Sequence, residues 1–275
     1  MSAAHARPPA RRRYGQHHLV DRGTLDAILA MARVAPDDVV LEVGAGDGLL
    51  TARLADRARF VHAFEIDKRF ADGLRELAAG RDDLRLYVTD GLRYRLADLD
   101  PAPTAVVANL AYNIAVPLIM RTIETLPSVG RWAVMLQREL AERLFAAPRT
   151  KAYSAVSVLV QLSCALEAQR PVGRTVFSPQ PRVDSAFVTF TRSQAREERG
   201  VDALDTLVRA SFGQRRKQLV NSLAGIAPPG AGPLTRAQVQ DALAALGLPE
   251  TTRPEELPPP VFVALGRQLG WLEAS

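Results

Sequence analysis

The sequence lacks most of the features that stabilise secreted proteins or anchor proteins in membranes. Its single cysteine, Cys164, excludes an internal disulfide, which fits a reducing compartment, and its apolar surroundings predict a packed core residue. No apolar run approaches the roughly 20 residues that a membrane-spanning helix needs. The first 13 residues are rich in alanine, proline and arginine but contain no apolar core of a secretory signal. We therefore expect a cytoplasmic protein without a membrane partner, in which residues 1–20 form a basic arm.

Positive charge is what the chain has in excess. The formal net charge of its 275 residues is +5 at pH 7, in a composition otherwise typical of globular proteins. Cations cluster at residues 11–13 and at Arg215, Arg216 and Lys217, as expected of a protein that binds a phosphate backbone. A solvated surface on an arginine-rich protein explains the same clusters about equally well, so composition alone leaves nucleic-acid binding open.

Helical and strand-like segments alternate from about residue 25 to residue 190. A predicted helix that Thr24 can cap precedes the first strand. The predicted strands cover residues 39–43, 60–65, 84–88, 105–108 and 132–136, with further helices between them. This alternation predicts a parallel sheet covered by helices on both faces. Residues 165–171 and 185–190 are strand-like without an intervening helix, so we expect a hairpin that adds one antiparallel strand.

The C-terminal third has a different pattern. Residues 204–223, 236–246 and 261–272 are predicted to be three helices separated by turns rich in proline and glycine. A polar stretch at 192–199 is interpreted as a linker. The expected fold is an α/β, Rossmann-like domain over residues 21–191, followed by a small all-helical domain over residues 199–275.

A glycine-rich turn after the first strand predicts a cofactor site. Gly44 and Gly46 allow the backbone to approach a ligand closely. Glu65 follows about 20 residues later, at the end of the next strand, where a carboxylate binds ribose hydroxyls. Asp90 follows the third strand, where it can accept a hydrogen bond from an adenine amino group. NAD and S-adenosylmethionine both fit this pattern, but the short turn and the preceding Glu42 favour zwitterionic S-adenosylmethionine over an anionic dinucleotide.

The tetrapeptide from Asn109 to Tyr112 follows the fourth strand, at the same edge of the predicted sheet. An exocyclic adenine amine is a poor nucleophile, and acceptors on its two N–H bonds favour a tetrahedral nitrogen. The Asn109 amide oxygen and the Leu110 main-chain carbonyl are the candidate acceptors, and the Tyr112 ring can stack on the base. An isolated N-x-x-Y is more often a turn beside a core aromatic residue. Here it follows the predicted cofactor-binding half of the domain, which favours an active site.

At this point the chain resembles a known family, the small-subunit rRNA adenine dimethyltransferases of the KsgA type, over nearly its whole length. The similar blocks are residues 13–21 (G-Q-N-F-L-x-D), 42–46 (E-I-G-P-G), 65–67 (E-x-D), 109–117 (N-L-P-Y-N-I-S-x-P), 135–139 (M-L-Q-K-E), 151–158 (S-K-x-Y-x-x-x-S-V) and 177–185 (F-x-P-x-P-K-V-D-S). Two residues depart from this pattern: His17 stands in place of asparagine, and Ala111 stands in place of proline.

The resemblance implies an S-adenosylmethionine-dependent enzyme. Its substrate would be two adjacent adenosines in a hairpin loop near the 3′ end of 16S rRNA, in an immature 30S subunit, and the enzyme would be a monomer. The implied cofactor contacts are His17, Leu19, Gly44, Glu65, Asp90 and Asn109. Phe177 matches the aromatic residue that covers the target base opposite Tyr112.

Three alternatives stay open. A related branch methylates an adenine of 23S rRNA and confers antibiotic resistance, but residues 211–223 and 253–257 resemble C-terminal segments of the small-subunit family. In that resemblance we hypothesise that Arg215, Arg216 and Lys217 bind rRNA phosphates. A second alternative is a ribosome-assembly protein that retains the methyltransferase fold; such a protein would not need the intact set Glu65, Asp90, Asn109 and Tyr112. A third is an NAD-dependent dehydrogenase, which would need a catalytic His or a Tyr–Lys pair, and neither is evident in the sequence. The adjacent His17 and His18 lack a third ligand, so no metal site is expected.

Overall fold

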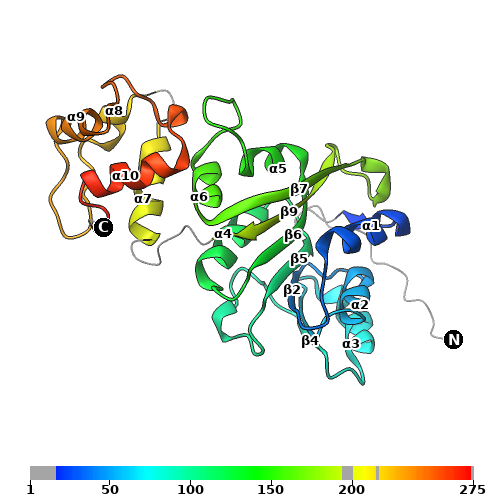
Figure 1. Cartoon of the computed structure of the whole chain (residues 1–275). Coiled ribbons are helices and arrows are strands. Elements are labelled where there is room, and N and C mark those ends of the chain that lie inside the picture. Colours follow the sequence, from blue (N-terminus) through cyan, green and yellow to red (C-terminus); the bar gives the residue numbers. More distant parts are fainter. Residues whose placement is uncertain (1–16, 194–200, 215–216, 274–275) are drawn as a thin grey trace. The chain divides into compact units, whose positions relative to one another are not determined.

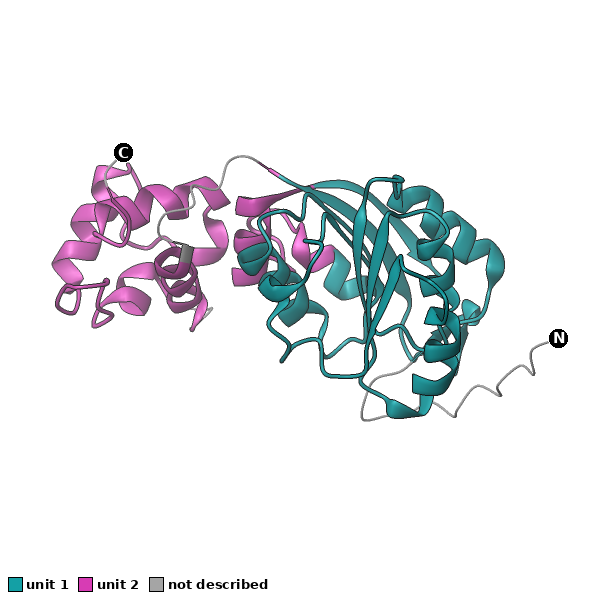
Figure 2. Cartoon of the chain, turned by 90° about the horizontal axis from the view of Figure 1, so that it is seen from below, with its two compact units in different colours: residues 1–141, 166–192 teal, residues 142–165, 193–275 magenta. Residues whose placement is uncertain are grey.

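The computed structural model describes residues 17–193, 201–214 and 217–273. The chain divides into two compact units (Figure 2): unit 1 comprises residues 1–141 and 166–192, and unit 2 comprises residues 142–165 and 193–275. Compactness does not by itself define an independently folding domain, so the ranges 21–191 and 199–275 stay a prediction. Within the described ranges, no helix is long and apolar enough to cross a membrane.

Unit 1 is built on a seven-stranded sheet in the order β4-β3-β2-β5-β6-β9-β7 (Figure 1). Its strands are β2 (Val39–Val43), β3 (Phe60–Phe64), β4 (Leu84–Tyr87), β5 (Ala105–Asn109), β6 (Arg131–Gln137), β7 (Cys164–Val172) and β9 (Ser185–Arg192). The first five pair in parallel, and β9 pairs antiparallel with β6. The predicted Rossmann-like sheet with an antiparallel strand is therefore confirmed.

The strand order places a ligand site between β2 and β5. From β2 the chain runs outward to β3 and β4, then returns to the other side of β2 as β5. Ligands bind outside the carboxyl ends of the strands at such a reversal. All five residues of β2 are buried, as its continuous apolar pattern predicts, so the sheet gives this edge a rigid base.

The helices of unit 1 follow the strands, and a short ribbon lies outside the sheet. They are α1 (Arg22–Ala32), α2 (Leu49–Ala55), α3 (Ala71–Ala78), α4 (Ala115–Thr125) and α5 (Arg138–Leu144), which continues into unit 2, with short 3-10 turns η2 (Lys68–Phe70), η3 (Leu96–Asp98) and η4 (Arg174–Val176). The ribbon pairs β1 (His18–Leu19) with β8 (Phe177–Ser178) in antiparallel register.

The N-cap of α1 differs from the prediction. Asp21, not Thr24, caps this helix: the Thr24 N–H donates to the Asp21 carboxylate over 2.6 Å. Asp21 has the extended backbone that an N-cap requires, whereas Thr24 already lies in the first turn. The prediction of a core cysteine is correct, since Cys164 is buried.

Unit 2 is helical in its described part. Its elements are α6 (Ala155–Ser163), α7 (Val201–Phe212), α8 (Leu219–Leu223), α9 (Arg236–Ala245), η5 (Pro254–Glu256) and α10 (Pro259–Gln268). The single helix predicted over residues 204–223 is wrong, because α7 ends at Phe212 and α8 begins at Leu219. Gly213 follows the end of α7 and disfavours helix, and the Leu219 N–H donates instead to the Thr252 carbonyl over 2.9 Å.

Candidate active site

A cavity of about 350 Å³ opens at the carboxyl edge of the sheet in unit 1. The predicted site residues that line it are His17, Gly44, Gly46, Glu65, Asp90, Asn109, Leu110, Tyr112 and Phe177. Leu19 lines a smaller cavity of about 50 Å³, whose wall also includes Gly44, Gly46 and Asn109. Ligand pockets in proteins are typically about 300–1,000 Å³, so the larger cavity has the size of a small-molecule site. The fold therefore assembles one site from segments spread over the sequence.

The glycine turn between β2 and α2 adopts a backbone that other residues avoid. Gly44 and Gly46 have φ angles of +89° and +57°. A Cβ on Gly46 would lie 3.3 Å from Nδ1 of His18. The turn thus brings its main chain close to the cavity without side chains in between, which fits the predicted cofactor cradle.

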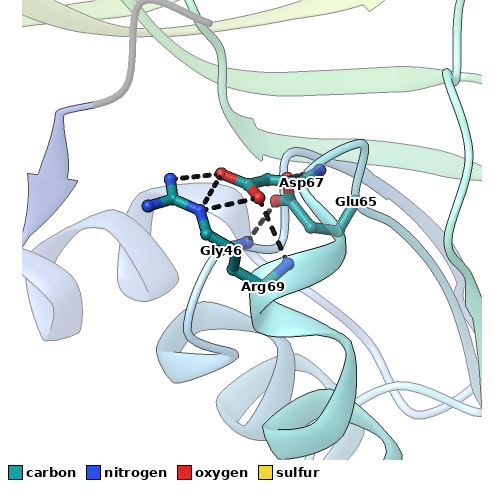
Figure 3. Close-up of polar contacts among 4 residues, drawn as sticks. All are labelled: Gly46, Glu65, Asp67 and Arg69. Carbon is teal, nitrogen blue, oxygen red and sulfur yellow. Dashed lines mark hydrogen bonds and ion pairs between the residues drawn. The ribbon is translucent and has the colours of Figure 1, made fainter. Parts of the chain in front are cut away.

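Glu65, at the end of β3, holds this turn (Figure 3). Its Oε2 accepts from the Gly46 N–H over 2.7 Å, and its Oε1 accepts from the Asp67 N–H over 2.8 Å. Burial raises the pKa of the Glu65 carboxyl, and the two main-chain donors oppose that effect. Each carboxylate oxygen retains further acceptor capacity, so Glu65 can hold the turn and bind a hydroxyl group at the cavity.

Glu42, in the middle of a buried strand, behaves differently from an ordinary surface carboxylate. Its side chain is 1% exposed, and burial raises its pKa to about 8. It is therefore largely protonated at neutral pH in the unliganded protein. Glu42 lines the smaller cavity, and in the unliganded protein it does not supply the fixed negative charge that the sequence suggested there.

Asp90 lies after β4 on the wall of the larger cavity. Its Oδ1 accepts from the Leu92 N–H over 2.9 Å, and Oδ2 lies 3.6 Å from Nε of Arg93. The Asp90 side chain is 33% exposed, so its carboxylate is oriented by the turn but still reaches solvent. This arrangement suits the predicted acceptor for an adenine amino group.

Asn109 ends β5 and is oriented by the N-terminal segment. Its Nδ2 donates to the main-chain carbonyl of His17 over 3.1 Å, which assigns Oδ1 to the opposite side of the amide. The Leu110 N–H donates to the Met135 carbonyl of β6 over 3.2 Å, so the start of the motif is tied to the sheet. Both predicted acceptors for an exocyclic amine therefore stand on a constrained backbone.

The rest of the motif forms a turn despite the alanine at position 111. The Ile114 N–H donates to the Ala111 carbonyl over 3.1 Å, which closes the turn without a proline. The Tyr112 ring lies 5.6 Å from the His17 ring, centroid to centroid, and its hydroxyl lies 3.4 Å from Oγ of Ser185. Tyr112 is therefore placed at the cavity wall and not in the core.

The segment after β8 is joined to the same wall by His17. Nδ1 of His17 donates to the Pro179 carbonyl over 2.8 Å, and Leu19 pairs in register with Phe177. Phe177 is 3% exposed and lines the cavity together with Tyr112. The histidine that departs from the family pattern thus links the ribbon to the Asn109–Tyr112 turn.

Several other residues line the cavity without a predicted role, and His18, Ile66 and Ser185 are three of them. Each of these three is adjacent in sequence to a predicted site residue or ends one of the blocks that resemble the family. That position was the only feature of the sequence that could have pointed to them. Of the predicted phosphate-binding residues, Lys217 is an exposed residue of unit 2, and Arg215 and Arg216 fall outside the described residues. In the described part of the chain, no group of three His, Cys, Asp or Glu residues could hold a metal ion.

Comparisons with known proteins identify the family of the chain. A model of the ribosomal RNA adenine dimethylase family matches residues 8–246. "Ribosomal RNA small subunit methyltransferase A" of Rubrobacter xylanophilus is 43% identical, with 95% of this chain and 96% of that protein covered. The protein of the same name from Geobacillus kaustophilus is 38% identical, over 93% and 89% of the two chains.

Two crystal structures resemble the fold over 92% of this chain. A dimethyladenosine transferase from Plasmodium falciparum has a TM-score of 0.77 and 27% identity, with 98% of its chain covered. The 23S rRNA methyltransferase ErmE has a TM-score of 0.66 and 30% identity, with 99% of its chain covered.

Proposed function

Because the chain belongs to the ribosomal RNA adenine dimethylase family, its activity is S-adenosylmethionine-dependent methylation of adenine in rRNA, and we propose that it dimethylates two adjacent adenosines near the 3′ end of 16S rRNA. The observation that carries this function is the single cavity shared by the glycine turn, Glu65, Asp90 and the oriented Asn109 amide. We take the immature 30S subunit as the substrate particle, and the cytoplasm as the place of reaction. We also take the enzyme to be a monomer.

The residues of the cavity fit the cofactor chemically. Gly44 and Gly46 offer a cradle that a Cβ would fill, Glu65 is available for ribose hydroxyls, and Asp90 for the adenine amino group. His17 and Leu19 would close the N-terminal side. When bound, S-adenosylmethionine supplies an electrophilic methyl group on a sulfonium centre.

Residues on the same wall of the cavity would bind the target adenine. Oδ1 of Asn109 and the main-chain carbonyl of Leu110 would accept the two hydrogens of the exocyclic amine, which directs its lone pair at the methyl group. Tyr112 and Phe177 would stack on the two faces of the extruded base. Such stacking is worth about 1–3 kcal/mol per base and offsets part of the cost of extrusion. Arg215, Arg216 and Lys217 would bind phosphates of the rRNA.

Methylation assays on ribosomal particles test the substrate. The chain would be incubated with methyl-labelled cofactor and either immature 30S particles or 50S subunits, and the modified nucleotides would be mapped. We expect label on two adjacent adenosines of 16S rRNA. Label confined to 50S would instead support the 23S activity of the relative ErmE, which is 30% identical. Binding to 30S without any label would support an assembly protein that retains the fold.

A further inference from the structure

Next to Glu65, Asp67 and Arg69 form an ion pair (Figure 3). The Asp67 side chain is 1% exposed, and the Arg69 side chain is 27% exposed. Nε of Arg69 donates to Oδ1 and Oδ2 of Asp67 over 3.0 and 3.1 Å, and its Nη2 donates to Oδ2 over 2.5 Å. The pair is multiply bonded, so the aspartate has little freedom to move.

The main chain of Asp67 connects this pair to Glu65. The Asp67 N–H donates to Oε1 of Glu65, while Oδ1 of Asp67 also accepts from the Arg69 N–H over 3.2 Å and caps η2. The side chain of Asp67 therefore fixes the peptide that orients Oε1, and Gly46 fixes Oε2. Loss of the Arg69 side chain would remove its Nε and Nη2 bonds to Asp67, and so loosen one of the two restraints that hold the Glu65 carboxylate.

Electrostatics give Arg69 a second effect on the same carboxylate. Burial raises the pKa of Glu65 most, and the negative charge of nearby Asp67 raises it further. The guanidinium of Arg69 is paired with that charge, so it offsets the repulsion between the two buried carboxylates. Without the guanidinium, the repulsion between the Asp67 and Glu65 carboxylates would be less well offset.

We propose that Arg69 is a positioning residue for the cofactor: through Asp67 it keeps the Glu65 carboxylate in the orientation that the ribose hydroxyls require. This proposal rests on the role of Glu65 proposed above. Arg69 needs no contact with the cofactor, and its effect is on cofactor binding and not on methyl transfer.

Replacement of Arg69 by glutamine tests the proposal. Calorimetry would measure the affinity of wild-type and Arg69→Gln protein for S-adenosylhomocysteine, and kinetics would measure KM for S-adenosylmethionine and kcat. We expect about a tenfold weaker affinity and a similarly raised KM, the size of one weakened hydrogen bond to a charged group, with kcat nearly unchanged. Arg75→Gln is the matched control, because Arg75 forms an exposed ion pair with Asp72 in α3 and should behave as wild type.

Two further measurements separate positioning from a structural role. The 2′,3′-dideoxy analogue of S-adenosylhomocysteine lacks the hydroxyls, so Arg69→Gln should bind it with the wild-type affinity for that analogue. In the Asp67→Asn background the ion pair is already absent, so the further change Arg69→Gln should alter the affinity little. If Arg69→Gln folds poorly, Arg69→Lys keeps one cation beside Asp67 and should give an intermediate loss.

The outcomes are distinct. Unchanged affinity in Arg69→Gln, an equal loss for the dideoxy analogue, or an undiminished effect of Arg69→Gln in the Asp67→Asn background would each overturn the positioning role. Failure of the wild-type chain to bind S-adenosylhomocysteine would instead overturn the cofactor site itself.

Discussion

The side-chain amide of Asn109 donates to the main-chain carbonyl of His17 over 3.1 Å. This bond joins the last residue of β5 to the segment that precedes β1, so the N-terminal ribbon sets the orientation of the amide. Because the bond uses the backbone of His17, it does not depend on the side chain that distinguishes this chain from its family pattern. The side chain makes a different hydrogen bond, with the Pro179 carbonyl.

Asn109→Ala should abolish turnover while leaving rRNA affinity largely unchanged. The variant removes the acceptor for the exocyclic amine, and loss of one such preorganised group typically costs about 10²–10³ in rate. Single-turnover methylation and a filter-binding assay would separate the two effects. Retained turnover would remove Asn109 from its proposed role, provided that the variant unfolds at the wild-type temperature.

Tyr112→Ala should weaken productive binding far more than Tyr112→Phe. The aromatic face is the part proposed to stack, and its loss should cost about 1–3 kcal/mol. The hydroxyl makes only a long hydrogen bond of 3.4 Å with Ser185, so its removal should have a small effect. Comparison of kcat/KM on 30S particles checks this. Equal losses in both variants would show that the hydroxyl, and not the ring, is the functional group.

Gly46→Ala should raise the KM for the cofactor. Its φ of +57° is strained for alanine, and the added Cβ would meet His18 at 3.3 Å. Gly73→Ala in α3 is the matched control, because nothing lies within 4 Å of its Cβ and alanine favours helix. Calorimetric titration with S-adenosylhomocysteine should show weaker binding for the first variant alone. Similar affinities in both would mean that the turn tolerates a side chain.

Glu42→Gln should stabilise the unliganded protein more at pH 8 than at pH 5. The carboxyl has an ordinary pKa of 4.5, and burial raises the pKa in the folded state to about 8. Between these values the folded state retains a proton that the unfolded state has lost, so wild-type stability falls as pH rises. The variant lacks this titration. Thermal unfolding at both pH values measures the difference, at roughly 2–4 °C per kcal/mol. A constant difference in Tm would contradict the raised pKa.

Charge reversal of residues 215–217 should reduce the salt dependence of rRNA binding. For each phosphate that the variant no longer neutralises, the slope of log affinity against log salt should become shallower by about 0.7–0.9. The matched control reverses Arg59, Arg75 and Arg95, exposed cations of unit 1. Affinities measured over a range of KCl concentrations give both slopes. If the two triple variants have the same slope, the basic triplet has no special part in phosphate binding.

Local pattern was sufficient for the sheet and for the edge that holds the site. Continuous apolar runs such as residues 39–43 are buried as predicted, because a parallel strand covered on both faces must exclude water along its whole length. Polar residues that end such runs, including Glu65 and Asn109, then lie at one edge. These residues line one cavity because parallel strands have their carboxyl ends at the same edge of the sheet, and the alternation of helix and strand had already predicted parallel strands.

Interactions between distant residues were decided by the tertiary structure. The sequence by itself determined which residue types reach the cavity, since periodicity reports on burial and strand ends. It did not determine that His17 orients Asn109, that Glu42 is buried deeply enough to retain a proton, or that α7 and α8 are separate helices. The sequence also did not determine that Arg69 pairs with buried Asp67. In a sequence pattern, an arginine in an ion pair near a strand end looks the same as an arginine exposed to solvent. Hydrogen-bond partners and desolvation depend on the path of the whole chain, and only the folded structure specifies that path.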